Sequence, residues 1–277
     1  MSSDINWTPA VTAVTFYAFV IVTAEVCRKT VEQFYRKGSQ PYLFFMELIA
    51  VTQQCTCVYE NAIMIKNYGP IGFFSAVFTI LVVTAQYNRG AYISPLLPVE
   101  MAWKEAMDSV TLLTLLAAQT LGGYSASRIA DSLWYYTSGY SAEHAQLYSN
   151  LPCALKYHVP FIFALGYEFL GCFVLRLVLS NLSLKYRRYI MPFVTSAALT
   201  FALVYVGVPG LNPVTTSSRL MGCPGLDLQW FMITYWTAPV LGWMAASYID
   251  RKKLFKVPKK GNPVPEQPKV NKKKKNK

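Results

Sequence analysis

The sequence predicts an all-α polytopic membrane protein with an inverted repeat: two sets of three helices, each with a re-entrant half-helix, plus an extra N-terminal hydrophobic helix. Three observations predict this class. Hydrophobic residues make up 53% of the 277 residues, which is high for a soluble protein. They gather in segments long enough to cross a bilayer. Two Gly/Pro breaks interrupt these segments at corresponding places in the two halves, which is typical of transport proteins.

The net charge of +12 is concentrated at the C-terminal end. Residues 251–277 contain 12 Lys and Arg and one acidic residue, Glu266, so the rest of the chain is nearly neutral. A basic tail on a neutral apolar body indicates a membrane protein with a cytosolic tail and no nucleic-acid partner. We therefore expect an N-terminal helix with a basic loop in 1–38, a membrane domain in 39–250 and a disordered basic tail in 251–277.

The first apolar segment, 7–26, is expected to span the membrane, with an interfacial helix as the alternative. Asp4 precedes it and basic residues 28–37 follow it, which favours an N-terminus outside the cytosol. Lys185–Arg188 then fall on the cytosolic side as well. The remaining spans are expected over 41–65, 71–85, 110–130, 159–180, 189–207 and 228–249, and the polar, aromatic stretch 131–157 is expected to be a loop.

The two breaks have the residues that start a helix. Asn212 is a good N-cap and Pro213 fits the first helical position. The segment from there to Cys223 is about half a membrane thickness. In the other break, Ser94 is expected to cap as Asn does, and Pro95 keeps its place. Half-helices that start at mid-membrane present free N–H groups there, so they must line a cavity or pack in protein.

These breaks resemble the two Asn-Pro-Ala boxes of the aquaporins. Asn212-Pro213-Val214 resembles the second box, and 90–96, ending Ser94-Pro95-Leu96, resembles the first with substitutions. Residues 235–242 resemble the sixth helix of that family, and Cys223 resembles the marker of its intracellular superaquaporin branch. The resemblance covers about 41–250. It implies a passive water channel, a homotetramer with one pore per subunit, no cofactor and residence in the endoplasmic reticulum.

The resemblance also places a selectivity filter, by offset from the boxes, on Phe74, Thr200, Pro209 and Thr215. Thr200 stands where strict water channels have His, and Thr215 stands in place of the filter Arg. Both changes would widen the constriction and remove a fixed charge. We therefore expect small neutral solutes, such as glycerol or hydrogen peroxide, to pass with water. Arg219 is expected at the surface or the lipid interface.

Glu47 and Glu168 lie in apolar segments, where a carboxylate needs a partner. The resemblance implies that they accept hydrogen bonds from the box loops; the alternative is a proton relay in a coupled carrier. Cys223 is interpreted as a small buried residue, and a bridge to Cys153 is left open. With two histidines and no Cys-x-x-Cys pair, we expect no metal site and no enzyme.

Lys274 and Lys275 resemble the dilysine retrieval signal of endoplasmic-reticulum membrane proteins, with attraction to anionic membrane lipid as the alternative. The sequence thus predicts an aquaporin-type channel for water and small neutral solutes. The rival hypothesis is a non-conducting scaffold with the same fold, in which Leu96 and Val214, both larger than the usual Ala, and Ser94-Pro95 narrow or close the pore.

Overall fold

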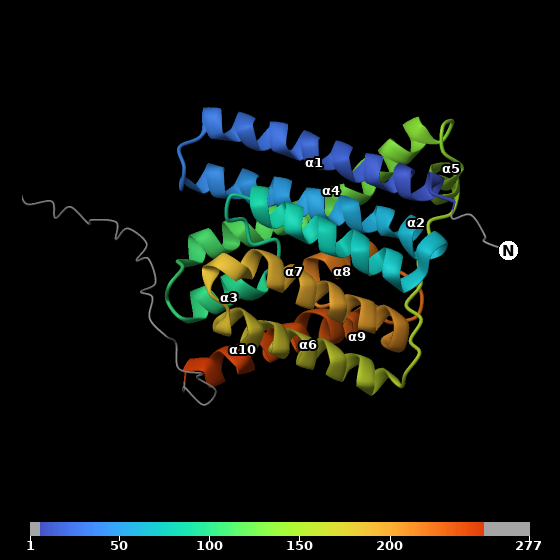
Figure 1. Ribbon diagram of the computed structural model, residues 1–277. Coiled ribbons are helices and arrows are strands. Elements are labelled where there is room, and N and C mark those ends of the chain that lie inside the picture. Colours follow the sequence, from blue (N-terminus) through green and yellow to red (C-terminus); the bar gives the residue numbers. More distant parts are fainter. Residues whose placement is uncertain (1–5, 252–277) are drawn as a thin grey trace, which may run out of the picture.

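The computed structural model describes residues 6–251, and all the regular structure in this range is helical. Lys274 and Lys275 lie outside it. The first half of the chain contains α1 (Thr8–Phe34), α2 (Gln40–Tyr87), α3 (Leu96–Trp103), α4 (Ser109–Thr137) and α5 (Ala142–Ser149). The second half contains α6 (Phe161–Asn181), α7 (Leu184–Phe201) with a π-helical continuation η1 (Ala202–Val206), α8 (Pro213–Leu220), α9 (Leu228–Met232), η2 (Ile233–Thr237) and α10 (Ala238–Arg251) (Figure 1).

The 48-residue α2 is two spanning passes joined at a sharp break. Gly69 has φ 61° and ψ −151°, a backbone conformation that glycine adopts without steric cost, and Pro70 follows it. Within the described range, α1, α2, α6 and the run from Leu184 to Val206 are long and apolar enough to cross a membrane. The 29-residue α4 has the necessary length as well. The protein is therefore a multi-pass membrane protein.

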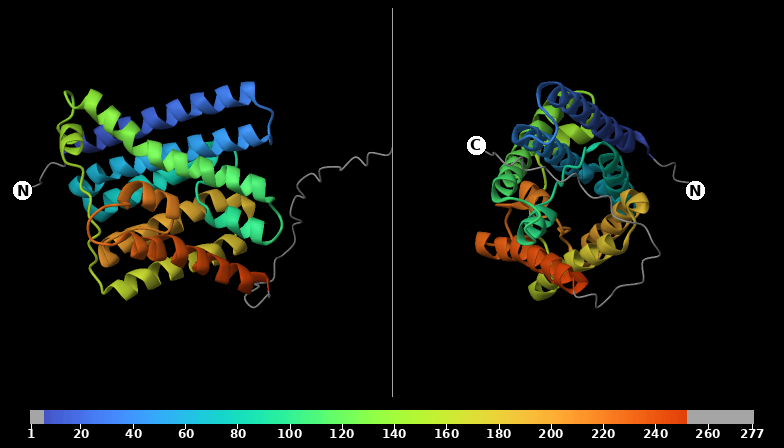
Figure 2. Two further views of the ribbon diagram at one scale, coloured as in Figure 1. Left: turned by 180° about the vertical axis from the view of Figure 1, so that it is seen from behind. Right: turned by 90° about the vertical axis from the view of Figure 1, so that its left-hand side faces the viewer.

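The two halves of the chain pack as two matching groups of helices. In the first, α2 packs on α4; in the second, α6 packs on α10; and α2 joins the groups by packing on α7. Seen end-on, the long helices form a ring, and α1 lies outside it against α2 (Figure 2). The short helices α3 and α8 come from opposite ends of the bundle. This is the inverted repeat that the sequence predicts.

The N-terminal helix α1 is longer than predicted and runs alongside the first pass of α2. Near its start, Ala10 N donates to Tyr68 Oη at 3.1 Å, and further along Tyr17 Oη donates to Asn61 Oδ1 at 2.7 Å. Arg28 was expected in a loop, but it is fully buried within the helix. It can be buried there because it donates to Gln53 Oε1 and its Nη1 lies 3.5 Å from the Glu25 carboxylate. The contacts extend over most of the first pass of α2, as for a helix that spans beside it.

The segment 131–157 is not simply the loop that was expected. α4 continues to Thr137, and α5 follows a short turn. The reason is a buried carboxylate, Glu60, on α2. It accepts from Trp134 Nε1 at 2.7 Å and pairs with His144 Nε2 at 2.9 Å. Trp134 and His144, two of the polar and aromatic residues that suggested a loop, are therefore partners of Glu60.

On the side of the bundle where α3 ends, a capped turn leads into α4. The Asp108 carboxylate accepts from Thr111 N at 2.9 Å and from Thr111 Oγ1 at 2.7 Å. These bonds favour the charged carboxylate and lower the pKa of Asp108 below its ordinary value. The backbone N–H of Thr111 has the larger effect, and its hydroxyl has the smaller one. This cap fixes where the half-helix turns back into a spanning helix.

Candidate functional site

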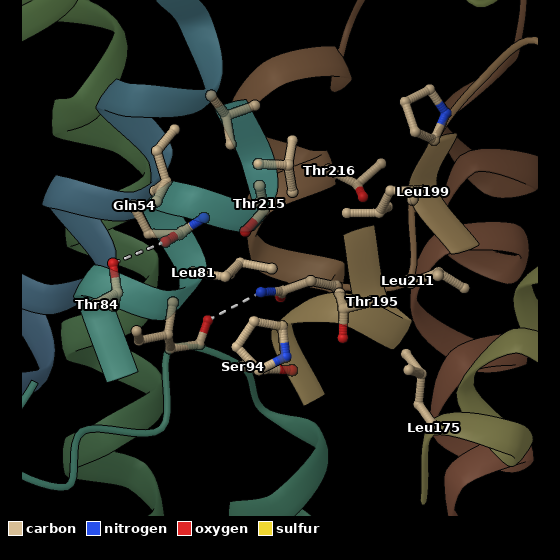
Figure 3. A pocket seen from close by; sticks show the side chains of 18 of the residues that line it. Gln54, Leu81, Thr84, Ser94, Leu175, Thr195, Leu199, Leu211, Thr215 and Thr216 are labelled. Atoms are coloured by element: carbon tan, nitrogen blue, oxygen red, sulfur yellow. Dashed lines mark hydrogen bonds between the residues drawn. The ribbon is translucent and has the colours of Figure 1, made fainter. Parts of the chain in front are cut away.

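The two break loops touch each other at the centre of the bundle. Asn212 begins α8 as predicted: its Oδ1 accepts from Val214 N at 3.2 Å, and Pro213 occupies the first turn. Its Nδ2 donates to Ile93 O, in the other break loop, at 3.1 Å (Figure 3). An amide nitrogen has two hydrogens, so Asn212 keeps one N–H that neither bond uses.

Ser94 caps its half-helix more weakly than expected. Its Oγ lies 3.5 Å from Leu96 N, at the outer limit of a hydrogen bond. Helix α3 begins at Leu96, and no side chain caps it from Pro95. A serine side chain is one atom shorter than asparagine, and here it does not reach further into the first turn. The two half-helices are therefore equal in length, at 8 residues each, but unequal in their caps.

A buried carboxylate on α2 holds the first break loop. Glu47 Oε2 accepts from Tyr92 N at 2.8 Å, and its Oε1 accepts from Ile93 N at 2.7 Å. Gln119 Nε2, on α4, donates to the same Oε1 at 2.8 Å. Ile93 has φ 62°, which costs a β-branched residue about 1–2 kcal/mol. The hydrogen bonds to Glu47 hold Ile93 in that conformation.

The second break loop repeats this arrangement with fewer bonds. Leu211, which precedes Asn212, has φ 65° and donates its N–H to Glu168 Oε2 at 2.7 Å. A Cβ on Gly210 would collide with the Glu168 carboxylate, so the glycine permits this close approach. Both glutamates therefore accept backbone N–H groups of the loops.

A cavity of about 500 Å³ lies beside the two break loops. Its wall includes Asn88 and Leu179 toward one end of the bundle and Phe73 and Leu203 toward the other. Most lining side chains are apolar, but polar ones interrupt them, among them Gln54, Thr84, Ser94, Thr195, Thr215 and Thr216 (Figure 3), and also Asn61, Asn212 and Arg219. The cavity thus follows the bundle on both sides of the half-helix starts, where their N–H groups concentrate positive potential.

Two of the four expected filter residues line this cavity. Pro209 and Thr215 belong to its wall, and Phe73 lines it where Phe74 was expected. The ring of Phe74 instead stacks on Phe78, with centroids 6.0 Å apart. The offset was counted back from Ser94 through the break loop and the end of α2, and it misses the cavity-facing side of the helix by one residue.

The same one-residue difference occurs at Thr200. Leu199 lines the cavity, whereas Thr200 does not and donates its hydroxyl to Ser196 O at 2.8 Å. Between these residues and Asn212 lies the π-turn Ala202–Val206. A π-turn contains an extra residue relative to an α-turn. A count made along a regular helix therefore falls on the wrong face.

Arg219 was expected at the surface or the lipid interface, but the structure places it at the wall of the cavity. It lines the cavity and donates to Pro152 O, with its guanidinium 5.4 Å from the centre of the Tyr59 ring. It lies four residues after Thr215 on α8, and residues so spaced share a helix face. This spacing was the signal that could have placed it.

A further cluster around a buried carboxylate, that of Glu100, was not predicted from the sequence. Glu100, on α3, accepts from Arg176 Nε at 2.6 Å and Nη2 at 2.7 Å, from Trp243 Nε1 at 2.7 Å and from Ser247 Oγ at 2.7 Å. Lys104 Nζ lies 2.6 Å from it. The cluster fastens α3 to α6 and α10. An acid in one half-helix and an arginine in an apolar helix were its signals.

Cys153 and Cys223 form a disulfide. It joins the segment before α6 to the turn after α8, at the end of the bundle opposite the turn that joins α1 to α2. Of the two interpretations of Cys223, the bridged one is correct, and the residue is also buried. The bridge covers the outer end of α8.

Comparisons with known proteins show which family the chain belongs to. A scan of protein-family models finds no match. Putative aquaporin-10 of Caenorhabditis elegans is 38% identical over 246 residues, which cover 88% of each chain. Aquaporin-11 of Milnesium tardigradum is 25% identical over 238 residues, or 84% of each chain. Among solved structures, the aquaglyceroporin of Plasmodium falciparum matches with a TM-score of 0.46 and 14% identity, covering 76% of this chain and 92% of that one. The chain belongs to the aquaporin family.

Proposed function

We propose that the protein is a passive membrane channel for water and small neutral solutes such as glycerol and hydrogen peroxide. The observation that carries this proposal is a cavity lined by both break loops, with wall residues toward both ends of the bundle. Members of this family are channels, so the protein is not an enzyme.

The electrostatics of the cavity favour neutral permeants. Two half-helix starts meet there, and each presents backbone N–H groups and the positive end of its dipole. Such a site repels cations and attracts the oxygen of water or of a hydroxyl group. The unused N–H of Asn212 adds a donor of the same kind.

The primary test is stopped-flow shrinkage of proteoliposomes that contain the purified protein, beside empty liposomes. Asn212→Trp should abolish fast shrinkage, because the indole would fill the space beside the break loops. Asn150→Trp, at an exposed position, is the control and should leave it unchanged. Shrinkage of the wild type no faster than that of empty liposomes would contradict the proposal.

The proposed passage of solutes is tested separately at Thr215, which lines the cavity. Thr215→Arg introduces a large, charged side chain and should reduce glycerol flux more strongly than water flux. Thr215→Val keeps the shape of threonine and adds no charge, so it should change the ratio of the two fluxes little. Equal reduction of both fluxes by Thr215→Arg would count against passage of solutes through this wall.

A non-conducting scaffold remains the second candidate, and Leu96 is the observation in its favour. Its side chain reaches the cavity wall beside the break loops, and apolar constrictions can close a pore by excluding water. Leu96→Ala distinguishes the candidates: it should restore water flux if Leu96 alone closes the pore. In a conducting channel it should change flux only moderately.

We also propose, from the resemblance, that the chain belongs to the superaquaporin branch, forms a homotetramer and resides in the endoplasmic reticulum. Replacement of Lys274 and Lys275 by Ser should release a fluorescent fusion to later compartments if they are a retrieval signal. Unchanged localisation would favour the lipid-attraction alternative. Mass photometry of the detergent-solubilised protein would measure the number of subunits.

A further inference from the structure

A chain of buried polar groups leads from α1 to the cavity wall. It begins at Arg28 of α1, which donates to Gln53 Oε1 on the first pass of α2. Gln53 Nε2 donates to Thr84 Oγ1, on the second pass, at 3.2 Å, and Thr84 Oγ1 donates to Gln54 Oε1 at 3.5 Å. All four residues are buried. Helix α1, which lies outside the ring of helices, is therefore connected to the cavity.

The direction of this chain is set by its first member. A guanidinium group donates hydrogen bonds and accepts none, so Gln53 must turn its oxygen to Arg28 and its nitrogen to Thr84. The Thr84 hydroxyl then accepts from Gln53, and its one hydrogen is available to Gln54. Gln54 takes this hydrogen through its oxygen, which is turned to Thr84 at 3.5 Å, the outer limit of a hydrogen bond.

The nitrogen of Gln54 consequently faces the other way. Gln54 lines the cavity, and Figure 3 shows its oxygen turned toward Thr84 and its nitrogen turned away from Thr84 and into the cavity. Within residues 6–251, Gln54 Nε2 has no hydrogen-bond partner in the protein, although the residue is only 7% exposed. The nitrogen is not enclosed by protein and is open to the cavity, so an acceptor in the cavity can reach it, and an amide donor that finds no acceptor is costly.

We propose that Gln54 is a selectivity residue that presents an amide donor to the permeant, and that Arg28 is the positioning residue that fixes this orientation. The inference rests on the proposed function. Gln54 and Asn212 then each offer one N–H to the cavity, so a permeant oxygen can accept from both. An ammonium ion, which has donors but no acceptor, gains nothing from either group.

The experiment measures water and ammonium permeability of the full chain in proteoliposomes. Gln54→Leu removes the donor at similar volume, and Gln229→Leu, at an exposed position of α9, is its control. Arg28→Met removes the donor-only group that sets the direction, and the exposed neighbour Lys29→Met is its control. Thr84→Val breaks the same chain one link later, with almost no change of shape.

We expect Gln54→Leu to lower water permeability at least threefold. Arg28→Met and Thr84→Val should raise the ratio of ammonium to water permeability at least threefold, because Gln54 can then turn its oxygen to the cavity. A merely structural role would lower both permeabilities together and leave the ratio unchanged. Both controls should match the wild type. Size-exclusion profiles and an intact Cys153–Cys223 bridge confirm folding.

Three outcomes overturn proposals, and they are distinguishable. If the wild type conducts water and Gln54→Leu conducts equally well, the role of Gln54 is wrong while the channel function stands. If Gln54→Leu behaves as expected but folded Arg28→Met keeps the wild-type ratio, the positioning role of Arg28 is wrong, and if folded Thr84→Val also keeps it, Gln54 is not oriented through this chain. If the wild type conducts no water, the proposed function fails, and this inference fails with it.

Discussion

The buried carboxylates Glu47 and Glu168 occupy matching positions in the two halves, yet their surroundings differ. Glu47 receives three hydrogens: two from backbone N–H groups and one from Gln119. Glu168 receives one backbone N–H, from Leu211, and among the described residues only its Oε2 accepts a hydrogen bond. Glu47 therefore contributes more to holding the first break loop than Glu168 contributes to holding the second.

We predict that Glu47→Gln destabilises the protein by about 1–3 kcal/mol, because the new NH₂ group must face a backbone or side-chain donor and leaves it unpaired. Glu168→Gln should cost clearly less, because its amide oxygen can accept from Leu211 while its nitrogen points elsewhere. Thermal unfolding followed by size-exclusion chromatography measures both variants. Equal shifts in Tm for the two would contradict the assignment of three donors to one carboxylate and one donor to the other.

Between elements, the closest packing depends on glycine. Helices α6 and α10 approach so closely at Gly242 that an added Cβ would collide with the backbone carbonyl of Phe169. Small residues permit such close approach between membrane helices, where packing contributes much of the association energy. By contrast, Gly166 lies on α6, the helix that contains Phe169, and a Cβ added to it would meet nothing within 4 Å.

We predict that Gly242→Ala destabilises the protein by about 1–3 kcal/mol, because backbone cannot move aside as a flexible side chain can. Gly166→Ala is the matched control and should be neutral or slightly stabilising, since alanine favours the helix. The Tm of each variant in detergent measures the difference. A Gly242→Ala variant as stable as Gly166→Ala would show that α10 can shift away from α6 without cost.

The number and order of the long helices were predictable because each span is a long apolar run. The ends of these helices were less predictable, because a helix can continue through charged or polar residues when buried groups on other helices form hydrogen bonds with them. Arg28 is within α1 because Gln53 accepts from it, and the last turns of α4 form because Trp134 donates to Glu60. Such partners lie on other helices, and a single sequence does not indicate which helices will meet.

The break loops were predictable because the start of a half-helix depends on adjacent residues, such as Asn212 and Pro213. The wall of the cavity was not, because it depends on which helix face turns inward. The π-turn Ala202–Val206 changes that face between Leu199 and the break loop. Ser94 was expected to cap its half-helix as Asn does. It is a weaker cap, because its Oγ lies 3.5 Å from Leu96 N.

For the whole molecule, the two ends of the bundle differ in chemistry. One end of the bundle contains the turns at 35–39 and 182–183 and the end of α10. The basic residues Arg36, Lys37, Lys185, Arg187 and Arg188 lie in or next to these turns. The Cys153–Cys223 disulfide lies at the other end. Basic residues favour the cytosolic side, and disulfides persist in oxidising compartments. Two independent features therefore indicate the same orientation.

We predict that Cys153→Ser and Cys223→Ser each lower stability by about 2–4 kcal/mol, because the bridge closes a long loop between residues 70 apart in sequence. The double variant should be no less stable than either single one, since one bond is lost in all three. Thermal unfolding measures these shifts, and dithiothreitol should lower the Tm of the wild type alone. Additive shifts in the double variant would mean that the two cysteines act separately.

The same bridge tests the orientation of the chain in its membrane. In sealed microsomes, both cysteines should resist a membrane-impermeant maleimide added from the cytosolic side, even after reduction with a permeant thiol reagent. Opening the vesicles with detergent should then allow labelling. The comparison requires a background in which exposed Cys27 is replaced by Ser, whereas Cys55, Cys57 and Cys172 are buried. Labelling of Cys153 in sealed vesicles would reverse the orientation and place the basic turns outside the cytosol.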